Sequence, residues 1–239
     1  MKRQTYIAID LETTGLNPRL DRILEIGAVR VENGEQTASF STFVDVGIPV
    51  PEFITGLTGI TDEMARSGLP VERALIEFLD FCGECAILGH NILFDYGFLK
   101  QNMGNQGILF ERKGIDTFQI ARKYLPDLPS KSLENLCAHY GICQEKKHRA
   151  CEDAWSAGRL YQNLAKEFYD QCPEDFAPRQ LVYQAKKESP ITKSQKLYLL
   201  DLVKYHRIEL DVSIDSLTKS QASRMIDHII LQYGRIRRR

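Results

Sequence analysis

A change in hydrophobic period near residue 71 constrains the fold of this chain more than any other feature of its sequence. The segments 5–11, 22–31 and 37–46 are rich in β-forming residues, and Asn33-Gly34 marks a hairpin turn between the second and the third. An irregular loop is expected over residues 49–61. An amphipathic helix that packs on a flat surface is predicted from residue 71 onward. Its apolar residues recur at i, i+3, i+4, i+7, i+8 and i+11, at Val71, Ala74, Leu75, Phe78, Leu79 and Cys82.

Strands and helices alternate after this helix. Residues 86–88 read as a short apolar strand, and helical patterns follow at 94–102, 117–124, 132–139 and 150–169. Strands first, followed by alternating helices and strands, are typical of a mixed sheet covered by helices. The sequence therefore predicts an α/β fold.

The composition indicates a globular protein. Of the 239 residues, 43% are hydrophobic and 26% are charged, which excludes a disordered chain. No stretch approaches the roughly 18 consecutive apolar residues of a membrane span, and no secretory segment is recognisable at the N-terminus. Six cysteines are too few for a disulfide-rich scaffold. We therefore expect a cytoplasmic protein with reduced thiols and no membrane partner.

Proline-rich polar sequence predicts a linker at residues 171–190, between a large domain at 1–170 and a small one at 191–239. Residues 1–178 hold 18 Lys and Arg against 26 Asp and Glu, whereas residues 179–239 hold 13 against 6. The tetrapeptide Thr-Lys-Ser-Gln occurs at 192–195 and again at 218–221, each time before an apolar helical pattern. Because Thr-x-x-Gln in this position is a capping box, we expect a basic helical hairpin. It is either a pair of well-capped helices or a surface that binds nucleic acid or a partner.

Four acidic residues occupy positions where an unpaired carboxylate is costly. Asp10 and Glu12 are two residues apart at the end of the first strand, so both side chains project from one face. Asp95 follows the strand at 86–88 between apolar residues, and Asp153 lies among alanines on the inward side of the helix at 150–169. A hard divalent cation is the usual partner of clustered carboxylates.

Three motifs that contain these acids resemble those of the DnaQ-like 3′→5′ exonucleases. They are Asp10-Leu11-Glu12-Thr13-Thr14-Gly15, His90-Asn91-x-x-Phe94-Asp95 and His148-Arg149-Ala150-x-x-Asp153. The third has the DEDDh form, since the other subclass places a tyrosine four residues before the last aspartate, where this chain has Arg149. The segments 57–64 and 115–117 are also similar to the proofreading domains of bacterial replicative polymerases, the epsilon subunit and the PolC exonuclease domain. The resemblance covers about residues 4–170 and implies an RNase H-like fold.

The resemblance implies a centre of five catalytic residues and two divalent metal ions, Mg²⁺ or Mn²⁺. The metal ligands are expected to be Asp10, Glu12, Asp95 and Asp153, with Asp10 bridging both ions. His148 is expected to accept the proton of the attacking water, a role that suits histidine because its side chain exchanges protons near neutral pH. Two metal ions support phosphodiester hydrolysis by stabilising both the attacking and the leaving oxygen.

The resemblance also implies a set of substrate-binding residues, namely Thr13, Thr14, Leu16, Ile60, Asn91 and Phe94. Leu16 is expected to insert between the last two bases. The function implied is release of nucleoside 5′-monophosphates from single-stranded or frayed 3′ ends, of DNA in preference to RNA, with a DNA polymerase as a candidate partner. Two alternatives stay open: an exoribonuclease would use the same motifs, and an inactive binding module would be expected to lack a catalytic residue.

Two weaker candidates accompany this centre. Cys82-x-x-Cys85 resembles half of a zinc site, but Cys82 falls on the apolar helical stripe, which favours buried thiols. Glu25 is either a fifth acid of the centre or a strand carboxylate paired with a nearby arginine, and we favour the pairing.

Overall fold

The computed structural model describes residues 5–144, 148–186, 189–210 and 212–236, so the outermost residues of both expected domains lie outside it. The chain forms two compact units, residues 1–185 and residues 186–239. The boundary falls within the segment 171–190 that we expect to link two domains. No helix in the described ranges is long and apolar enough to cross a membrane.

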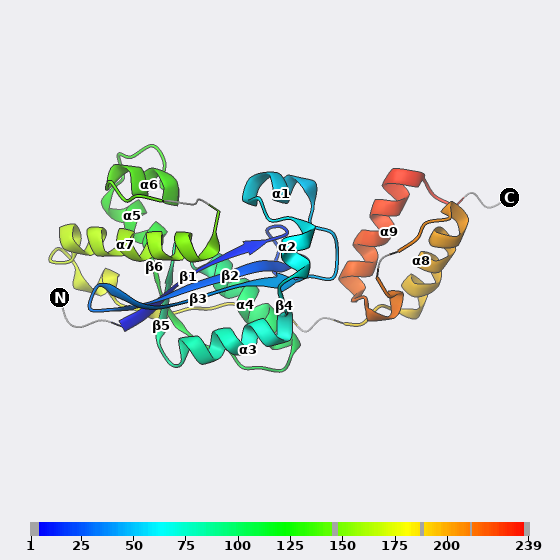
Figure 1. Cartoon of the computed structure of the whole chain (residues 1–239), viewed down its shortest axis with the longest axis horizontal. Coiled ribbons are helices and arrows are strands. Elements are labelled where there is room, and N and C mark those ends of the chain that lie inside the picture. Colours follow the sequence, from blue (N-terminus) through cyan, green and yellow to red (C-terminus); the bar gives the residue numbers. More distant parts are fainter. Residues whose placement is uncertain (1–4, 145–147, 187–188, 211, 237–239) are drawn as a thin grey trace. The chain divides into compact units, whose positions relative to one another are not determined.

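The first unit is built on one mixed sheet with the strand order β4-β3-β2-β1-β5-β6-β7 (Figure 1). β1, β2 and β3 form an antiparallel meander, while β5 runs parallel to β1 and β6 parallel to β5. Asn33 and Gly34, both at positive φ, form the predicted turn between β2 and β3. The strands are β1 (Thr5–Thr13), β2 (Ile23–Glu32), β3 (Glu35–Asp45), β4 (Leu69–Pro70), β5 (Ala86–Gly89), β6 (Lys113–Asp116) and β7 (Arg179–Gln180).

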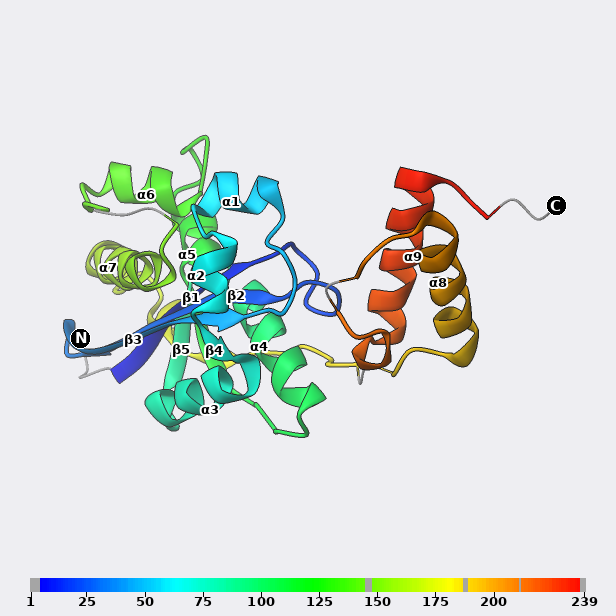
Figure 2. The same ribbon diagram turned by 45° about the vertical axis from the view of Figure 1, so that its right-hand side comes forward.

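Helices cover both faces of this sheet, as Figures 1 and 2 show from two directions. One face carries α3 (Val71–Cys82) and α4 (Leu93–Asn105), and the other α5 (Thr117–Tyr124), α6 (Leu133–His139) and α7 (Ala150–Phe168). The predicted α/β fold is therefore confirmed.

The residues of β1 alternate between the two helical layers. Ile7 and Ile9 lie in the core beneath α3 and α4, whereas Tyr6 and Ala8 lie in the core beneath α7. The same alternation directs Asp10 toward the α7 face of the sheet.

The predicted loop at 49–61 is wrong in part, because residues 52–58 form a helix. α1 (Glu52–Thr58) starts after Pro51 and ends where Gly59 adopts a φ of 70°. Ile54 is buried in the same cluster as Leu24 of β2, so packing rather than propensity holds this short helix. α2 (Asp62–Arg66) follows and is likewise not evident from the sequence pattern.

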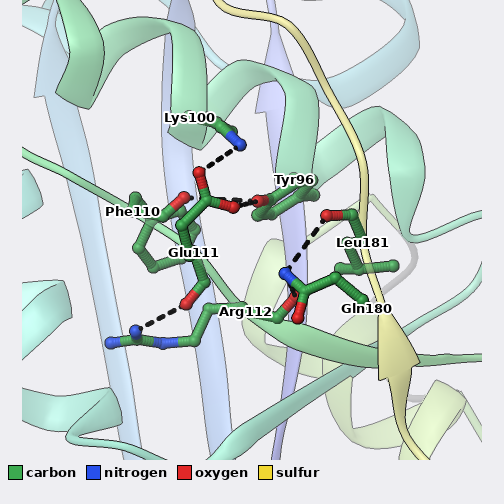
Figure 3. A network of polar contacts seen from close by, with 7 residues as sticks. All are labelled: Tyr96, Lys100, Phe110, Glu111, Arg112, Gln180 and Leu181. Atoms are coloured by element: carbon green, nitrogen blue, oxygen red, sulfur yellow. Dashed lines mark hydrogen bonds and ion pairs between the residues drawn. The ribbon is translucent and has the colours of Figure 1, made fainter.

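Polar contacts anchor the first turn of α4 to the segment that leads into β6 (Figure 3). The hydroxyl of Tyr96, a buried residue, donates to the carbonyl oxygen of Phe110 at 3.2 Å. The Glu111 carboxylate accepts from Lys100 at 2.7 Å, one helical turn further along. These contacts fix the end of α4 that carries Asp95.

Residues 173–181 belong to the first unit. The 3-10 helix η1 (Pro173–Phe176) buries Phe176 against aromatic side chains of α5 and α7, and β7 pairs antiparallel with β6. The side-chain amide of Gln180 donates to the Arg112 carbonyl oxygen (Figure 3). The stretch that joins the two units is therefore shorter than residues 171–190.

The second unit is a helical hairpin of α8 (Lys193–His206) and α9 (Lys219–Tyr233), with the 3-10 helix η2 (Ile214–Ser216) between them. Both predicted capping boxes are present. The hydroxyls of Thr192 and Thr218 accept from the backbone N–H of Gln195 and Gln221, whose side chains accept from the threonine N–H groups. The hairpin has its own apolar core, formed by Leu199, Leu202, Leu217, Ala222, Ile226 and Ile229.

Candidate active site

A glycine in β2 lets α7 approach the sheet closely beside the acids of β1. A Cβ atom on Gly27 would lie 2.1 Å from backbone atoms of Ala150 and Cys151, the first two residues of α7. Gly27 pairs with Asp10 in the register of β1 and β2, so the first turn of α7 lies over the end of β1. That turn contains Asp153. The predicted motifs do not include this glycine, although it permits the close approach of the helix to the sheet.

Three of the predicted catalytic side chains converge in one cleft. Carboxylate oxygens of Glu12 and Asp153 and a ring nitrogen of His148 lie within 4.8 Å of one another. Asp10 lines the same cleft, which has a volume of about 320 Å³. Its lining consists of Asp10, Leu11, Glu12, Ser132, Leu133, Glu134, Gln144, His148 and Asp153.

Asp95, the fifth predicted catalytic residue, approaches β1 from α4. Its side chain is 3% exposed, and its carboxylate accepts from the backbone N–H of Leu11 at 3.0 Å. Leu11 lies between Asp10 and Glu12 in the chain, so this bond joins α4 to the strand end that carries both acids. Asp95 does not line the cleft itself, but its charge acts on Asp10.

Burial raises the pKa of all four acids, and repulsion between carboxylates adds to the effect for Asp10, Glu12 and Asp95. Burial raises the pKa of Asp10 well above its ordinary value, and the charges of Asp95 and Asp153 add to the effect. Burial, followed by the charge of Asp153, raises the pKa of Glu12 to about 7. The pKa values of Asp95 and Asp153 are also raised, mainly by burial. Each shift opposes ionisation, so the ionised cluster needs positive charge from outside the side chains that form it.

The cluster fits a hard divalent cation. Glu12 and Asp153 offer carboxylate oxygens, the donors that hard divalent cations prefer, and His148 lies beside them. A cation stabilises ionised carboxylates and so reverses the pKa shifts that burial causes.

Glu25 pairs with Arg149, as favoured from the sequence. Nη1 of Arg149 lies 3.4 Å from Oε2 of Glu25, its Nη2 donates to the Thr58 carbonyl oxygen at 2.5 Å, and its guanidinium lies over the ring of Phe43. Because Arg149 follows His148, these contacts hold the His148 backbone, which has a φ of 56°. The sequence motif indicates only that Arg149 replaces a tyrosine, not that it has this role.

Residues from α6 and the segment after it also line the cleft, and no sequence motif points to them. A ring nitrogen of His90 lies 2.7 Å from the carbonyl oxygen of Lys131, next to Ser132, which caps α6. The side-chain amide of Gln144 donates to the Asp153 carboxylate at 3.0 Å. The second motif therefore has two roles: its His90 holds the start of α6, and its Asp95 contacts β1.

Three predicted substrate-binding residues lie at the end of β1 and in the loop after it, and this loop presents one apolar side chain. Leu16 is 85% exposed. The buried Thr13 donates its hydroxyl to the Gly15 carbonyl oxygen at 2.7 Å, and the Thr14 hydroxyl accepts from the Arg22 N–H at 2.9 Å. The two threonines thus shape the loop, while Leu16 is free to contact a ligand.

The remaining three predicted substrate-binding residues are placed differently. Asn91 is exposed at a φ of 66°, and its backbone N–H donates to the Asp116 carboxylate at 3.0 Å. Phe94 is partly buried, with its ring centroid 5.0 Å from that of Phe98. Ile60 is fully buried beside α1 and α2, so its side chain has no surface to offer a substrate.

Sequence comparisons place this chain with known exonucleases and DNA polymerases. A model of the exonuclease family (RNase_T) matches residues 7–161. A DNA polymerase III PolC-type protein of Clostridium perfringens is 37% identical over 166 residues, which are 70% of this chain and 12% of that protein. One of Pediococcus pentosaceus is 31% identical over 224 residues, covering 86% of this chain and 16% of that protein. The chain thus spans only a small fraction of these relatives.

Solved structures share the fold at low sequence identity. E. coli Exonuclease I in complex with a dT13 oligonucleotide superposes with a TM-score of 0.64 at 20% identity, over 72% of this chain and 43% of that one. The nuclease domain of 3′hExo, a DEDDh family member bound to rAMP, superposes with a TM-score of 0.63 at 17% identity, over 76% and 98%. Because the family match spans all three motifs and most of the first unit, the chain belongs to the exonuclease family, as its motifs predict.

Proposed function

We propose that the first unit is a metal-dependent 3′→5′ exonuclease that releases nucleoside 5′-monophosphates from DNA ends. The observation that carries the proposal is the convergence of Glu12, His148 and Asp153 within 4.8 Å, in a cleft that Asp10 also lines. Phosphodiester hydrolysis needs an activated water and neutralisation of charge on the leaving oxygen. The histidine can accept the proton of the water, and the clustered acids can hold the cations that would neutralise the charge on the leaving oxygen.

Asp10, Glu12, Asp95 and Asp153 would hold two divalent cations. Bound there, the cations would supply positive charge that stabilises the phosphate and the leaving 3′ oxygen. His148, exposed at the cleft, would accept the proton of the attacking water. Gln144, which donates to Asp153, keeps that carboxylate oriented.

The substrate side of the proposal rests on the loop after β1. Leu16 is an exposed aliphatic side chain on a short loop, and such side chains insert between stacked bases. Asn91 and Phe94 support the α4 side of the pocket. DNA is favoured because the curated relatives are named for DNA polymerase III and a neighbour in fold holds a dT13 oligonucleotide. A DNA polymerase is accordingly the proposed partner.

One experiment tests direction, metal dependence and substrate together. The full chain is incubated with Mg²⁺ or Mn²⁺ and with 5′-labelled single-stranded DNA or RNA of one sequence. We expect a descending ladder on DNA that disappears with a chelator and in His148→Ala. His139→Ala removes another exposed histidine, on α6, and should keep the ladder. Immediate loss of the label as a mononucleotide, or activity in His148→Ala, would contradict the proposal.

An exoribonuclease is the second candidate, because 3′hExo, a neighbour in fold, is bound to rAMP. A ladder mainly on RNA in the same experiment would select it. The catalytic residues and their proposed roles would then be unchanged.

A further inference from the structure

A hollow in the second unit combines aromatic and basic side chains on the outer face of α8. It has a volume of about 820 Å³ and is lined by Tyr198, Asp201, Lys204, Tyr205, Arg235 and Ile236. The inner face of α8 is occupied, since Leu199 and Leu202 pack in the hairpin core. The lining residues of α8 therefore form a separate stripe that the fold of the hairpin does not use.

The two tyrosines of this stripe present ring surface to solvent. Tyr198 is 37% exposed and Tyr205 is 50% exposed. They are seven residues apart, which at about 1.5 Å rise per residue places them two turns and roughly 10 Å apart on one side of the helix. The rings are thus spaced to meet different bases of one strand.

The histidine at the end of α8 helps to hold Arg235 at the same hollow. A ring nitrogen of His206 lies 3.0 Å from the carbonyl oxygen of Gly234, which is at a φ of 90°. This contact holds the segment after α9 against α8 and places Arg235 in the lining with Lys204. Neither cation forms an ion pair with an acid of the described part of the chain, whereas Lys196 pairs with Asp215.

The charge of the unit favours a polyanion. Residues 186–239 contain 12 Lys and Arg against 6 Asp and Glu. Aromatic rings that stack on bases, next to cations that contact phosphates, are how proteins bind single-stranded nucleic acid without sequence preference.

We propose that this hollow binds single-stranded DNA, with bases on Tyr198 and Tyr205 and phosphates on Lys204 and Arg235. The choice of DNA rests on the proposed function, because a nuclease that degrades DNA from its 3′ end gains substrate affinity from a second contact with the same strand. Asp201 is the one carboxylate among the described residues of the lining, and it opposes phosphate binding.

The test separates this site from the catalytic cleft by using a probe without ends. Fluorescence anisotropy of a labelled circular oligothymidylate, with a chelator present, measures binding by the full chain. In Tyr198→Leu/Tyr205→Leu we expect the Kd to rise at least about tenfold, because both rings on which bases would stack are lost. Tyr198→Phe/Tyr205→Phe keeps the rings and should keep the Kd. Circular dichroism of each variant checks that the hairpin remains helical.

Charge variants provide a second test, in which removing a cation should weaken binding and removing an acid should strengthen it. Lys204→Gln and Arg235→Gln should each reduce the slope of log Kd against log salt by about 0.7. Lys193→Gln removes an equal charge outside the hollow and should change the slope less. Asp201→Asn should tighten binding, because it removes the opposing carboxylate.

Failure of this proposal and failure of the proposed function give different results. Hydrolysis of p-nitrophenyl thymidine 5′-monophosphate needs only the catalytic cleft and should be unchanged in all the hairpin variants. An unchanged Kd in the double leucine variant, an equal effect of Lys193→Gln, or tighter binding of circular oligouridylate would each overturn the DNA site. Absent ester hydrolysis by the unaltered chain, with circular DNA still bound, would overturn only the nuclease function.

Discussion

The two units of this chain arrange charge in opposite ways. In the first unit, acids from β1, α4 and α7 lie close together; burial raises all their pKa values, and repulsion adds to the effect for the acids of β1 and α4. In the second unit, a net positive charge is distributed over a hairpin whose helices start at local capping boxes. The first arrangement exists only because distant segments pack together, and it opposes folding unless a cation is bound. The hairpin is specified by contacts between neighbours in the sequence, so its fold should tolerate single substitutions better than the first unit does.

The largest expected effect is the loss of catalysis when one acid of the cleft is neutralised. Asp153→Asn keeps the size of the side chain but removes a proposed metal ligand, so the rate of mononucleotide release should fall by about 10³-fold or more. Asp127→Asn, in the loop before α6, is the matched control and should keep the rate. Circular dichroism confirms folding, and a rate within tenfold of the unaltered chain would contradict the assigned site.

Removal of Arg149 should have the next largest effect, and on stability. In Arg149→Met the buried Glu25 loses its partner, which costs about 3 kcal/mol by analogy with other broken buried pairs. Urea unfolding measures the loss. The double variant Glu25→Gln/Arg149→Met removes the unpaired charge and should recover much of it. Equal stability of the single and double variants would mean that the pair is not the source of the effect.

Gly27→Ala should destabilise the first unit by about 2 kcal/mol, because the new methyl group meets the backbone of α7 and must push the helix away. Gly158→Ala in α7 is the matched control. Its Cβ would meet Ala8 at an ordinary 3.6 Å, and alanine favours the helix by up to about 1 kcal/mol. Thermal unfolding should therefore show opposite shifts for the two substitutions. A stabilising Gly27→Ala would contradict the close approach of α7.

The stability of the metal-free first unit should fall as the pH rises through neutrality. The pKa of Glu12 is raised from 4.5 to about 7 in the folded chain, so the folded state binds its proton more tightly than the unfolded state. This contribution is fully present below about pH 4.5 and is lost as the pH rises to about 7. Melting temperatures across this range, with and without Mg²⁺, measure it. Glu12→Gln should remove this contribution and leave the part of the slope that the other three acids cause, and Mg²⁺ should stabilise most above pH 7.

The smallest expected effect is local to the hairpin. Thr192→Ala and Thr218→Ala each remove one capping hydroxyl and should destabilise α8 or α9 by about 1 kcal/mol. Hydrogen exchange should accelerate in these helices while the amides of β1 and β2 stay protected. Faster exchange in β1 as well would show that the two units do not unfold independently.

Much of the architecture follows from local pattern. The β-rich segments, the Asn33-Gly34 turn and the helical stripe from Val71 to Cys82 each carry a signal within a few residues, and the structure has strands, a turn and a helix there. The two capping boxes are equally local. α1 is not, because Ile54 holds it by contact with a distant strand rather than by its own propensity.

The sequence by itself determined the family, the three motifs and the acids and histidine that they contain, because each motif is a short run of residues with a fixed spacing. Only the tertiary structure decided which other groups surround them. Gly27 admits α7, Arg149 ties His148 to β2 and α1, and Gln144 contacts Asp153. These contacts join segments far apart in the chain, and they depend on packing distances that no local spacing encodes. Ile60 shows the same limit, since it lies in a segment that resembles the family yet its side chain is buried in the core.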